Sequence, residues 1–264
     1  MAAQVLYVYA IAGADHPMPV RAEAVDGTDR LAMVQGNGLG AFYTAVDGAG
    51  FSQAAIDARS NDVEWLGAIG YRHQAVMSAL MRGGTIIPLR AFTLFADETS
   101  LRQHLLDHRG EYMAILQRLG GKEEWTLRIE FQPETWSEAI TRRVESLRRL
   151  RAEMDGAASG KAYLLGKKLE EEKKKASREA EQQLVSEVEQ AVMKTLVCET
   201  ISESRLQRGG AFPQINILAN RDEEARLQEL RDELNRRYSG DGVAIVLTGP
   251  WPPYSFTGTM NSDR

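Results

Sequence analysis

Residues 61–88 read NDVEWLGAIGYRHQAVMSALMRGGTIIP and place a helix and a strand in one short stretch. Asn61 is a candidate N-cap with Glu64 three residues later, and Gly83–Gly84 offer a left-handed exit from the helix. The run Thr85–Ile87 predicts a short buried strand that ends at Pro88. Between cap and exit, the side chains recur at the spacing of one helical face: Leu66, Ile69, His73, Val76 and Leu80. This succession indicates an α+β fold.

The chain before this helix is predicted to consist mainly of strands and turns. Residues 5–11 (VLYVYAI) are rich in β-branched and aromatic types and precede a stretch with Gly13 and two prolines. Further strands are expected at 20–25, 31–35 and 41–46, because glycine or aspartate bounds these segments.

After the short strand the pattern alternates again between helix and strand. A second helix is expected from about Asp97 to Gly120–Gly121, and residues 125–131 (WTLRIEF) alternate as a strand. Pro133 then breaks the chain. We therefore expect two domains, covering residues 1–132 and 133–264.

The second domain is expected to combine a long charged helix with a β-α-β unit. Residues 137–207 contain no proline and are typical of helix, with interruptions near Gly156 and Gly160. The densely charged stretch 167–181 is typical of a solvated helix face, with a scaffold that docks other proteins as the alternative. After Gly209–Gly210 follow a strand, a helix and a strand, at 214–219, 222–238 and 243–248.

Composition limits the classes of function. The net charge of −5 gives no general attraction to nucleic acid, and the apolar runs are all too short to cross a bilayer. Cys198 is the only cysteine, so no disulfide forms within the chain, and the N-terminus lacks the pattern of a signal peptide. These features predict a cytoplasmic protein without nucleic-acid or membrane partners.

Two motifs suggest chemistry weakly. Gly36–Ala41 (GNGLGA) has the spelling of a dinucleotide loop, but the strand-forming FYTAV follows where a helix is required, so a turn is favoured. His104 and His108 are four residues apart on a predicted helix and could share a metal ion, although no third ligand is evident. His73 is expected to be a packed core histidine and Cys198 an inert thiol on a helical segment. No catalytic, cofactor-binding or metal-binding residue is assigned.

The C-terminal string 247–256 (LTGPWPPYSF) is unusual, because three prolines among aromatic residues disfavour any regular element. A terminal strap docked on its own domain is the simplest interpretation, and a partner-contacting surface is the alternative. This string closely resembles the C-terminal signature of the gas vesicle protein F/L family. Further blocks resemble the family in the same order: Tyr7–Ala10, Trp65 with Tyr71–His73, Thr85–Arg90, Glu124–Trp125 and Gly160–Leu164.

The resemblance implies a set of family-motif positions without a catalytic role. They are Tyr7, Tyr9, Trp65, His73, Pro88, Arg90, Trp125, Tyr163, Gly249, Pro250, Trp251, Pro252, Pro253, Tyr254 and Phe256. One departure is visible, since the family usually continues Pro-Leu-Arg with Phe-Gly-Thr, whereas Ala91-Phe92-Thr93 follows Arg90 here. If the missing glycine supplies a special backbone angle, the loop differs locally.

The resemblance also implies fold and role. It implies an N-terminal domain of modified ferredoxin-like fold, a C-terminal α+β domain, and no enzymatic activity or cofactor. The expected partners are the small shell-forming gas vesicle protein and other gas vesicle accessory proteins, met during vesicle assembly, with the gas-facing surface as one location. The alternative from another class is a small-molecule or metal-binding enzyme that uses Gly36–Ala41 or His104 and His108.

Overall fold

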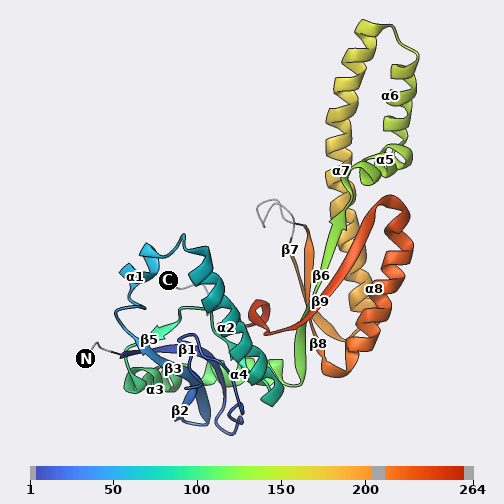
Figure 1. Ribbon diagram of the computed structural model, residues 1–264. Helices are drawn as coiled ribbons and strands as arrows, with labels where there is room; N and C mark the ends of the chain where they lie inside the picture. The colour runs from blue at the N-terminus through green and yellow to red at the C-terminus, as the bar shows by residue number, and fades with distance from the viewer. Residues whose placement is uncertain (1–3, 204–211, 259–264) are drawn as a thin grey trace. The chain divides into compact units, whose positions relative to one another are not determined.

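The computed structural model describes residues 4–203 and 212–258, and its contacts divide the chain into two compact units (Figure 1). Unit 1 comprises Met1–Glu124 and Pro250–Arg264, and unit 2 comprises Trp125–Gly249. Each unit has its own sheet, its own helices and its own buried apolar cluster. The expected α+β class with two domains is confirmed.

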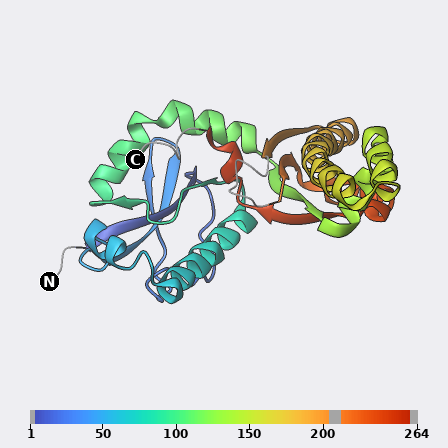
Figure 2. The same ribbon diagram turned by 90° about the horizontal axis from the view of Figure 1, so that it is seen from above.

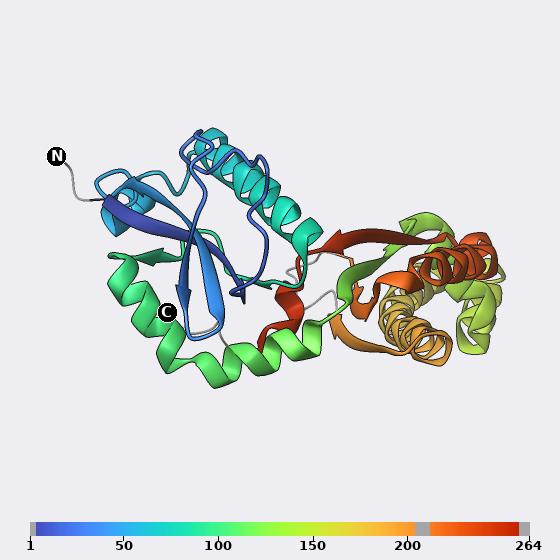
Figure 3. The same ribbon diagram turned by 90° about the horizontal axis from the view of Figure 1, so that it is seen from below.

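Unit 1 is built around the antiparallel pair β1 (Gln4–Gly13) and β3 (Leu39–Asp47). The sheet order is β2-β3-β1-β4, with β2 at Ala32–Gly36, β4 at Ile87–Pro88, and β5 (Leu94–Phe95) pairing separately with β1. Residues 6–12 of β1 are all buried, which indicates cover on both faces of the sheet. Figures 2 and 3 show this cover, with α2 (Val63–Gly83) on one side and α3 (Glu98–Asp107) and α4 (Arg109–Leu119) on the other.

The order of elements in unit 1 departs from a regular ferredoxin-like fold at the first connection. A ferredoxin-like fold places a helix after its first strand. Here residues 14–31 connect β1 to β2 without a helix, and the helices follow β3: α1 (Gln53–Ala58), α2, and then α3 and α4 after β5. The strand predicted at 20–25 is wrong, because this segment pairs with no strand. Instead, Val25 N donates a hydrogen bond to Tyr9 Oη at 3.0 Å.

The predicted helix of residues 61–83 exists with a different cap. Asp62, in place of Asn61, accepts a hydrogen bond from Trp65 N at 3.0 Å, and the helix begins at Val63. Gly84 ends it with φ 151° and ψ −161°, a region open essentially to glycine alone, and not the left-handed helical region expected. The second predicted helix is divided into α3 and α4 at His108, with Asp97 and Ser100 forming a capping box.

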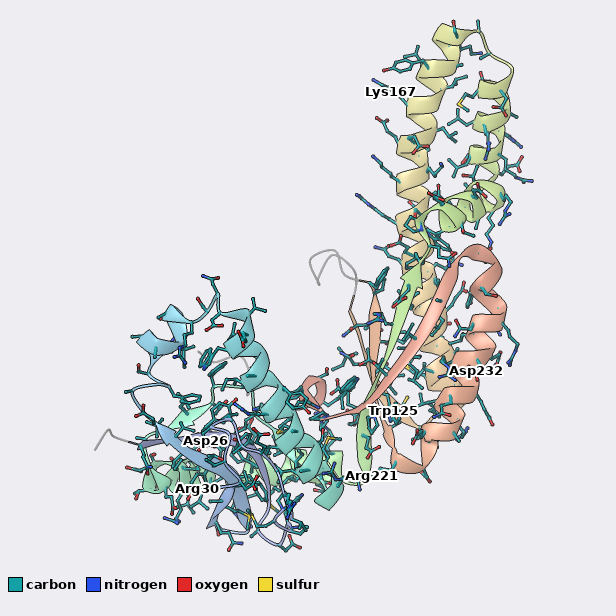
Figure 4. The ribbon with its side chains drawn as sticks, in the orientation of Figure 1. Asp26, Arg30, Trp125, Lys167, Arg221 and Asp232 are labelled. Atoms are coloured by element: carbon teal, nitrogen blue, oxygen red, sulfur yellow. The ribbon has the colours of Figure 1, made fainter. Side chains whose placement is uncertain are left out.

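Unit 2 has a four-stranded sheet of order β7-β8-β6-β9. Its strands are β6 (Lys122–Phe131), β7 (Cys198–Glu203), β8 (Gln214–Asn220) and β9 (Val243–Trp251). The helix α8 (Glu224–Tyr238) connects β8 to β9, flanked by the 3-10 turns Arg221–Glu223 and Ser239–Asp241, which confirms the expected β-α-β unit. Trp125 lies on β6 in the buried cluster of this unit (Figure 4).

Three helices form most of the helical region expected over 137–207. They are α5 (Pro133–Arg143), α6 (Glu145–Asp155) and α7 (Ser159–Thr195), and α6 packs against α7 (Figure 1). The interruption expected near Gly156 and Gly160 is confirmed by the break between Asp155 and Ser159. The prediction is wrong beyond Thr195, because Cys198–Glu203 is a strand paired with β8, so Cys198 is not on a helix. Residues 204–207 and Gly209–Gly210 lie outside the described residues.

The units differ from the expected ranges 1–132 and 133–264 at two points. The strand β6 begins in unit 1 and continues through the sheet of unit 2, so the division falls at Glu124 and Trp125. The C-terminal string also differs from expectation. Its first part, to Trp251, is the end of β9, and its second part, including the 3-10 turn Tyr254–Phe256, packs in unit 1.

Candidate functional site

A buried histidine between two tyrosines joins the family-motif positions of unit 1. Tyr7 Oη lies 3.0 Å from His73 Nδ1, and Tyr254 Oη lies 2.9 Å from His73 Nε2. These side chains come from β1, α2 and the C-terminal segment, and the sequence separates the last pair by 181 residues. The expectation of a packed, hydrogen-bonded core histidine at position 73 is confirmed. Neutral imidazole has one donor and one acceptor nitrogen, so one tyrosine donates and the other accepts.

Burial keeps this cluster uncharged. It lowers the pKa of His73 to about 4 and raises the pKa values of Tyr7 and Tyr254 above their usual range. Beside them, Tyr9 Oη donates to Thr44 Oγ1 at 3.3 Å, and burial raises the pKa of Tyr9 as well. A neutral, fully bonded network in which every group has a structural partner is typical of a core that fixes geometry.

The C-terminal segment is fixed in unit 1 by a second contact. Glu124 is 5% exposed, and its carboxylate accepts hydrogen bonds from Ser255 N at 3.0 Å and from Ser255 Oγ at 2.7 Å. Pro252, Pro253 and Phe256 are buried. The proline-rich motif is thus a strap that docks on the N-terminal unit, whereas the sequence favoured docking on its own domain.

An aromatic cluster extends from Tyr7 to the loop after Arg90. Phe92 lies 6.2 Å from Tyr7, 6.5 Å from Phe51 and 5.5 Å from Trp65 between ring centroids. Phe92 has φ 66°, a left-handed conformation that L-residues with bulky side chains rarely adopt. In the resemblance noted above, this position corresponds to the glycine of Phe-Gly-Thr, and Phe92 adopts a backbone angle that glycine would adopt at lower cost.

The other motif positions are spread over both units. Pro88 lies in β4 opposite Ala10 of β1, and the Arg90 carbonyl accepts a hydrogen bond from Thr93 Oγ1 at 2.7 Å. Trp125 is buried in the core of unit 2. Tyr163 is 63% exposed near the start of α7, beneath the ammonium group of Lys167. Gly249, Pro250 and Trp251 form the exposed end of β9. The structure therefore brings together Tyr7, Tyr9, Trp65, His73 and Tyr254, and does not unite the whole set.

A groove of about 820 Å³ lies beside α4 in unit 1. Gly110, Met113, Ala114 and Gln117 line one side, and their spacing places them on one face of that helix. The opposite face of α4 carries Tyr112 and Leu119, which are buried. Pro17 and Gly83–Gly84 line the groove from the other elements. Met113 is 40% exposed, so the lining presents apolar surface to solvent.

His16 supports the floor of this groove. Its ring packs edge-on against Phe42 with centroids 5.2 Å apart, and Nδ1 donates to the Pro17 carbonyl at 3.0 Å. The ring is so close to α2 that a Cβ on Gly83 would lie 2.8 Å from His16 Cε1. His16 is 8% exposed, and its Nε2 is buried without a hydrogen-bond partner among the described residues.

The two sequence motifs that suggested chemistry have structural roles. Asn37 and Gly38, with φ 54° and 84°, form the two-residue turn that joins β2 to β3, so Gly36–Ala41 is a tight hairpin and no helix follows it. His104 Nε2 lies 2.6 Å from Tyr112 Oη, and His108 Nδ1 donates to the His104 carbonyl at 3.0 Å. Burial, and then the nearby His108, lower the pKa of His104.

Three features of the residues in the described ranges 4–203 and 212–258 bear on metal chemistry, thiol reactivity and membrane insertion. These residues contain no group of three or more histidine, cysteine, aspartate or glutamate side chains placed to hold a metal ion. Cys198 is half-buried, and burial together with Glu223 and Glu199 raises the pKa of its thiol. None of the described helices is long and apolar enough to cross a membrane.

Comparison with known proteins gives the family. The family described as "Gas vesicle synthesis protein GvpL/GvpF" matches residues 5–258. The chain belongs to the gas vesicle F/L family. Gas vesicle protein L of Streptomyces sp. (strain CB03234) is 29% identical over 260 residues, which cover 97% of this chain and 94% of that protein. Gas vesicle protein L of Haloferax mediterranei is 27% identical over 196 residues, covering 70% of this chain and 60% of that protein.

Solved structures of family members share the fold. The crystal structure of gas vesicle protein GvpF from Microcystis aeruginosa has a TM-score of 0.68 at 16% identity, and covers 96% of this chain and 98% of that one. GvpF from Anabaena sp. PCC7120 has a TM-score of 0.65 at 17% identity, covering 96% of both chains. Membership of the F/L family gives this chain a gas vesicle-related role.

The sequence did not indicate the groove of unit 1. The predicted helix after Asp97 was assigned by its buried face, and the lining residues occupy the other face of α4. A signal was nevertheless present, because Gly110, Met113 and Ala114 are small or apolar residues at helical spacing where charged ones would be usual.

Proposed function

We propose that this F/L family member is a non-catalytic assembly factor that holds the hydrophobic shell-forming gas vesicle protein through the groove beside α4. The single observation that supports this most is an open groove of about 820 Å³ with a solvent-exposed apolar lining on a well-anchored unit. A shell subunit with an apolar face aggregates before assembly unless a partner covers that face.

The groove has the chemistry of a peptide-binding surface. Met113 and Leu116 offer apolar contact, and methionine adapts its shape to a bound partner. The glycines at 38 and 110 leave room for a main chain to approach, since a Cβ added at either position would meet no atom within 4 Å. An amphipathic helix or extended segment of the shell protein fits such a surface.

We expect the packed core of unit 1 to hold the groove in shape. The floor residue His16 packs on Phe42 of β3 and on the end of α2. The other end of the core holds the His73 network and the docked C-terminal strap. A pre-formed groove loses less entropy on binding than a mobile one. In this account the buried motif residues position the groove and touch no partner.

The test is capture of the shell protein by the full chain and two matched variants. Met113→Glu places a charge in the groove, whereas Met193→Glu changes a methionine that is 52% exposed on α7 of unit 2. We expect Met113→Glu to reduce captured shell protein about fivefold or more, and Met193→Glu to leave capture near wild type. Equal capture by both variants, with equal melting temperatures, would rule out this groove as the site.

Other gas vesicle accessory proteins are further proposed partners, with the gas vesicle as the location of the complex. The gas-facing surface of the vesicle is one proposed position for this chain. It is supported by family membership and by the two-unit architecture, which offers surfaces besides the groove.

A further inference from the structure

The corner between α5 and α6 in unit 2 concentrates arginine. Residues 141–151 (TRRVESLRRLR) contain five arginines, no lysine and one acidic residue, Glu145, in a chain whose net charge is −5. The neighbouring stretch 161–175 of α7 instead contains six lysines and no arginine. Figure 4 shows these helices side by side, with Lys167 labelled on α7. Arginine is therefore concentrated at the corner of α5 and α6, and lysine on the neighbouring part of α7.

The helix α6 turns its arginines away from its packing face. Leu147, Leu150 and Met154 belong to the apolar cluster of unit 2, in which α6 packs on α7. Arg148 and Arg151 stand three residues apart on another face, one helical turn from each other. Together with Arg142 of α5 they line a groove of about 510 Å³, which Thr141, Ala152 and Asp155 complete.

The existing ion pairs leave part of this charge unused. Arg143 pairs with Asp241, and Glu145 is shared by Arg148 and by Arg149, whose Nε lies 2.8 Å from the carboxylate. Arg142 and Arg151 form no hydrogen bond or ion pair with any residue of the described ranges 4–203 and 212–258. The groove thus presents two unpaired guanidinium groups and a third that a competing carboxylate could share.

We propose that this arginine groove binds an acidic segment of a partner protein. Arginine has a planar fork of donors that matches a carboxylate bidentately, which lysine does not. Arg148 and Arg151 are about 5 Å apart along the helix axis, a rise that matches carboxylates one turn apart on a partner helix. The site lies in unit 2, so it is independent of the groove that is proposed to hold the shell protein.

The groove fits a peptide better than a nucleic acid. Asp155 lines it and Glu145 adjoins it, and both would repel the uniform charge of a phosphate backbone. A peptide can instead place carboxylates opposite the arginines and main-chain N–H groups opposite Asp155. The six lining residues also include no aromatic side chain on which a base would stack.

The experiment measures binding of a fluorescent probe to the full-length protein. The probe is an alanine-based helical peptide with glutamates one turn apart, and its control has glutamine at the same positions. The test variant Arg142→Gln/Arg151→Gln removes the two unpaired charges. The matched control, Arg178→Gln/Arg236→Gln, removes two exposed arginines of α7 and α8 outside the groove.

We expect the glutamate peptide to bind wild type and the control variant alike, and to bind the test variant about tenfold more weakly. Binding should also weaken when the NaCl concentration rises, because exposed charges are screened. Arg142→Lys/Arg151→Lys keeps the charge and loses the fork, so its affinity should fall between those of wild type and the glutamine variant.

Three outcomes would overturn the proposal. The first is absence of glutamate-peptide binding by wild type, or equal binding of the glutamine peptide. The second is equal loss of affinity in the test and control variants, which would indicate general electrostatics. The third is tighter binding of tripolyphosphate or a single-stranded oligonucleotide than of the peptide, lost in the test variant, which would assign the groove to phosphate.

Discussion

Replacement of Phe92 separates backbone strain from side-chain packing in the aromatic cluster of unit 1. Phe92 has φ 66°, and its ring contacts Tyr7, Phe51 and Trp65. Both Phe92→Gly and Phe92→Ala remove the ring, and we expect each to lower the free energy of unfolding by about 2 kcal/mol. The two variants differ in that alanine retains a Cβ in the left-handed region and glycine does not.

The difference between the two variants has a predicted sign. A non-glycine residue in the left-handed region costs about 1–2 kcal/mol, and glycine loses about 0.4–1 kcal/mol more than alanine through the freedom of the unfolded chain. Phe92→Gly should therefore be more stable than Phe92→Ala by about 0.8 kcal/mol, the difference between the midpoints of the two ranges. Urea unfolding followed by circular dichroism measures both values.

Phe51 provides the internal control. It belongs to the same aromatic cluster, and Asn37 and Phe92 are the only non-glycine residues with positive φ in the described ranges, so Phe51 has ordinary backbone geometry. Phe51→Gly should be less stable than Phe51→Ala, the usual order. If Phe92→Ala equals or exceeds Phe92→Gly in stability, the positive φ and the reasoning about the family glycine are refuted.

Three further predictions concern the core of unit 1. Burial lowers the pKa of His73 to about 4 in the folded state, so between about pH 6.5 and 4 the unfolded chain binds more protons, and the free energy of unfolding falls with acidification by at most about 3 kcal/mol. Chemical denaturation at several pH values should show a smaller fall for His73→Gln than for wild type. An unchanged slope in the variant would contradict a neutral, buried histidine. Tyr254→Phe removes the hydroxyl 2.9 Å from His73 Nε2 and should lower the free energy of unfolding by about 1–3 kcal/mol, with a lower melting temperature. Tyr163→Phe, at an exposed site, should change the melting temperature little. Equal effects of the two substitutions would argue against docking of the strap. Gly83→Ala directs a Cβ to within 2.8 Å of His16 Cε1 and should destabilise the protein by about 1–3 kcal/mol. Gly67→Ala, on the same helix, meets no atom within 4 Å and should stabilise the protein by up to about 1 kcal/mol. Destabilisation by both substitutions would show that the packing around His16 is not the cause.

The sequence predicted best where one period dominated a long segment. The helix α2 and the strand β6 follow from the spacing of their apolar residues, because each buries a defined face, whereas β1 and β3 follow from runs rich in β-branched and aromatic types. The sequence failed at 20–25, where alternation occurs without a partner strand, and at 198–203, where helix-compatible residues are held in a strand by pairing with β8. Local sequence does not encode such long-range pairing.

The candidate site depended even more on long-range contacts. The spacing of residues 66–80 placed His73 on a buried face, yet nothing local to Tyr254 identifies its partner 181 residues away. The resemblance to the F/L family singled out Tyr7, Tyr9, His73 and Tyr254. The structure shows that these four side chains lie together in the core of unit 1. The groove beside α4 could be recognised only in the folded structure, because its lining comes from β1, the β2–β3 turn and two helices.

The central claim is that this F/L family member keeps the shell-forming gas vesicle protein from aggregating before assembly. The most direct measurement is the fraction of shell protein that remains soluble after co-expression with the full-length chain, with Met113→Glu, with Met193→Glu, and with an unrelated protein. The account predicts a higher soluble fraction with wild type and Met193→Glu than with Met113→Glu or the unrelated protein. A soluble fraction that is the same in all four cases, with every partner folded and expressed equally, would contradict it.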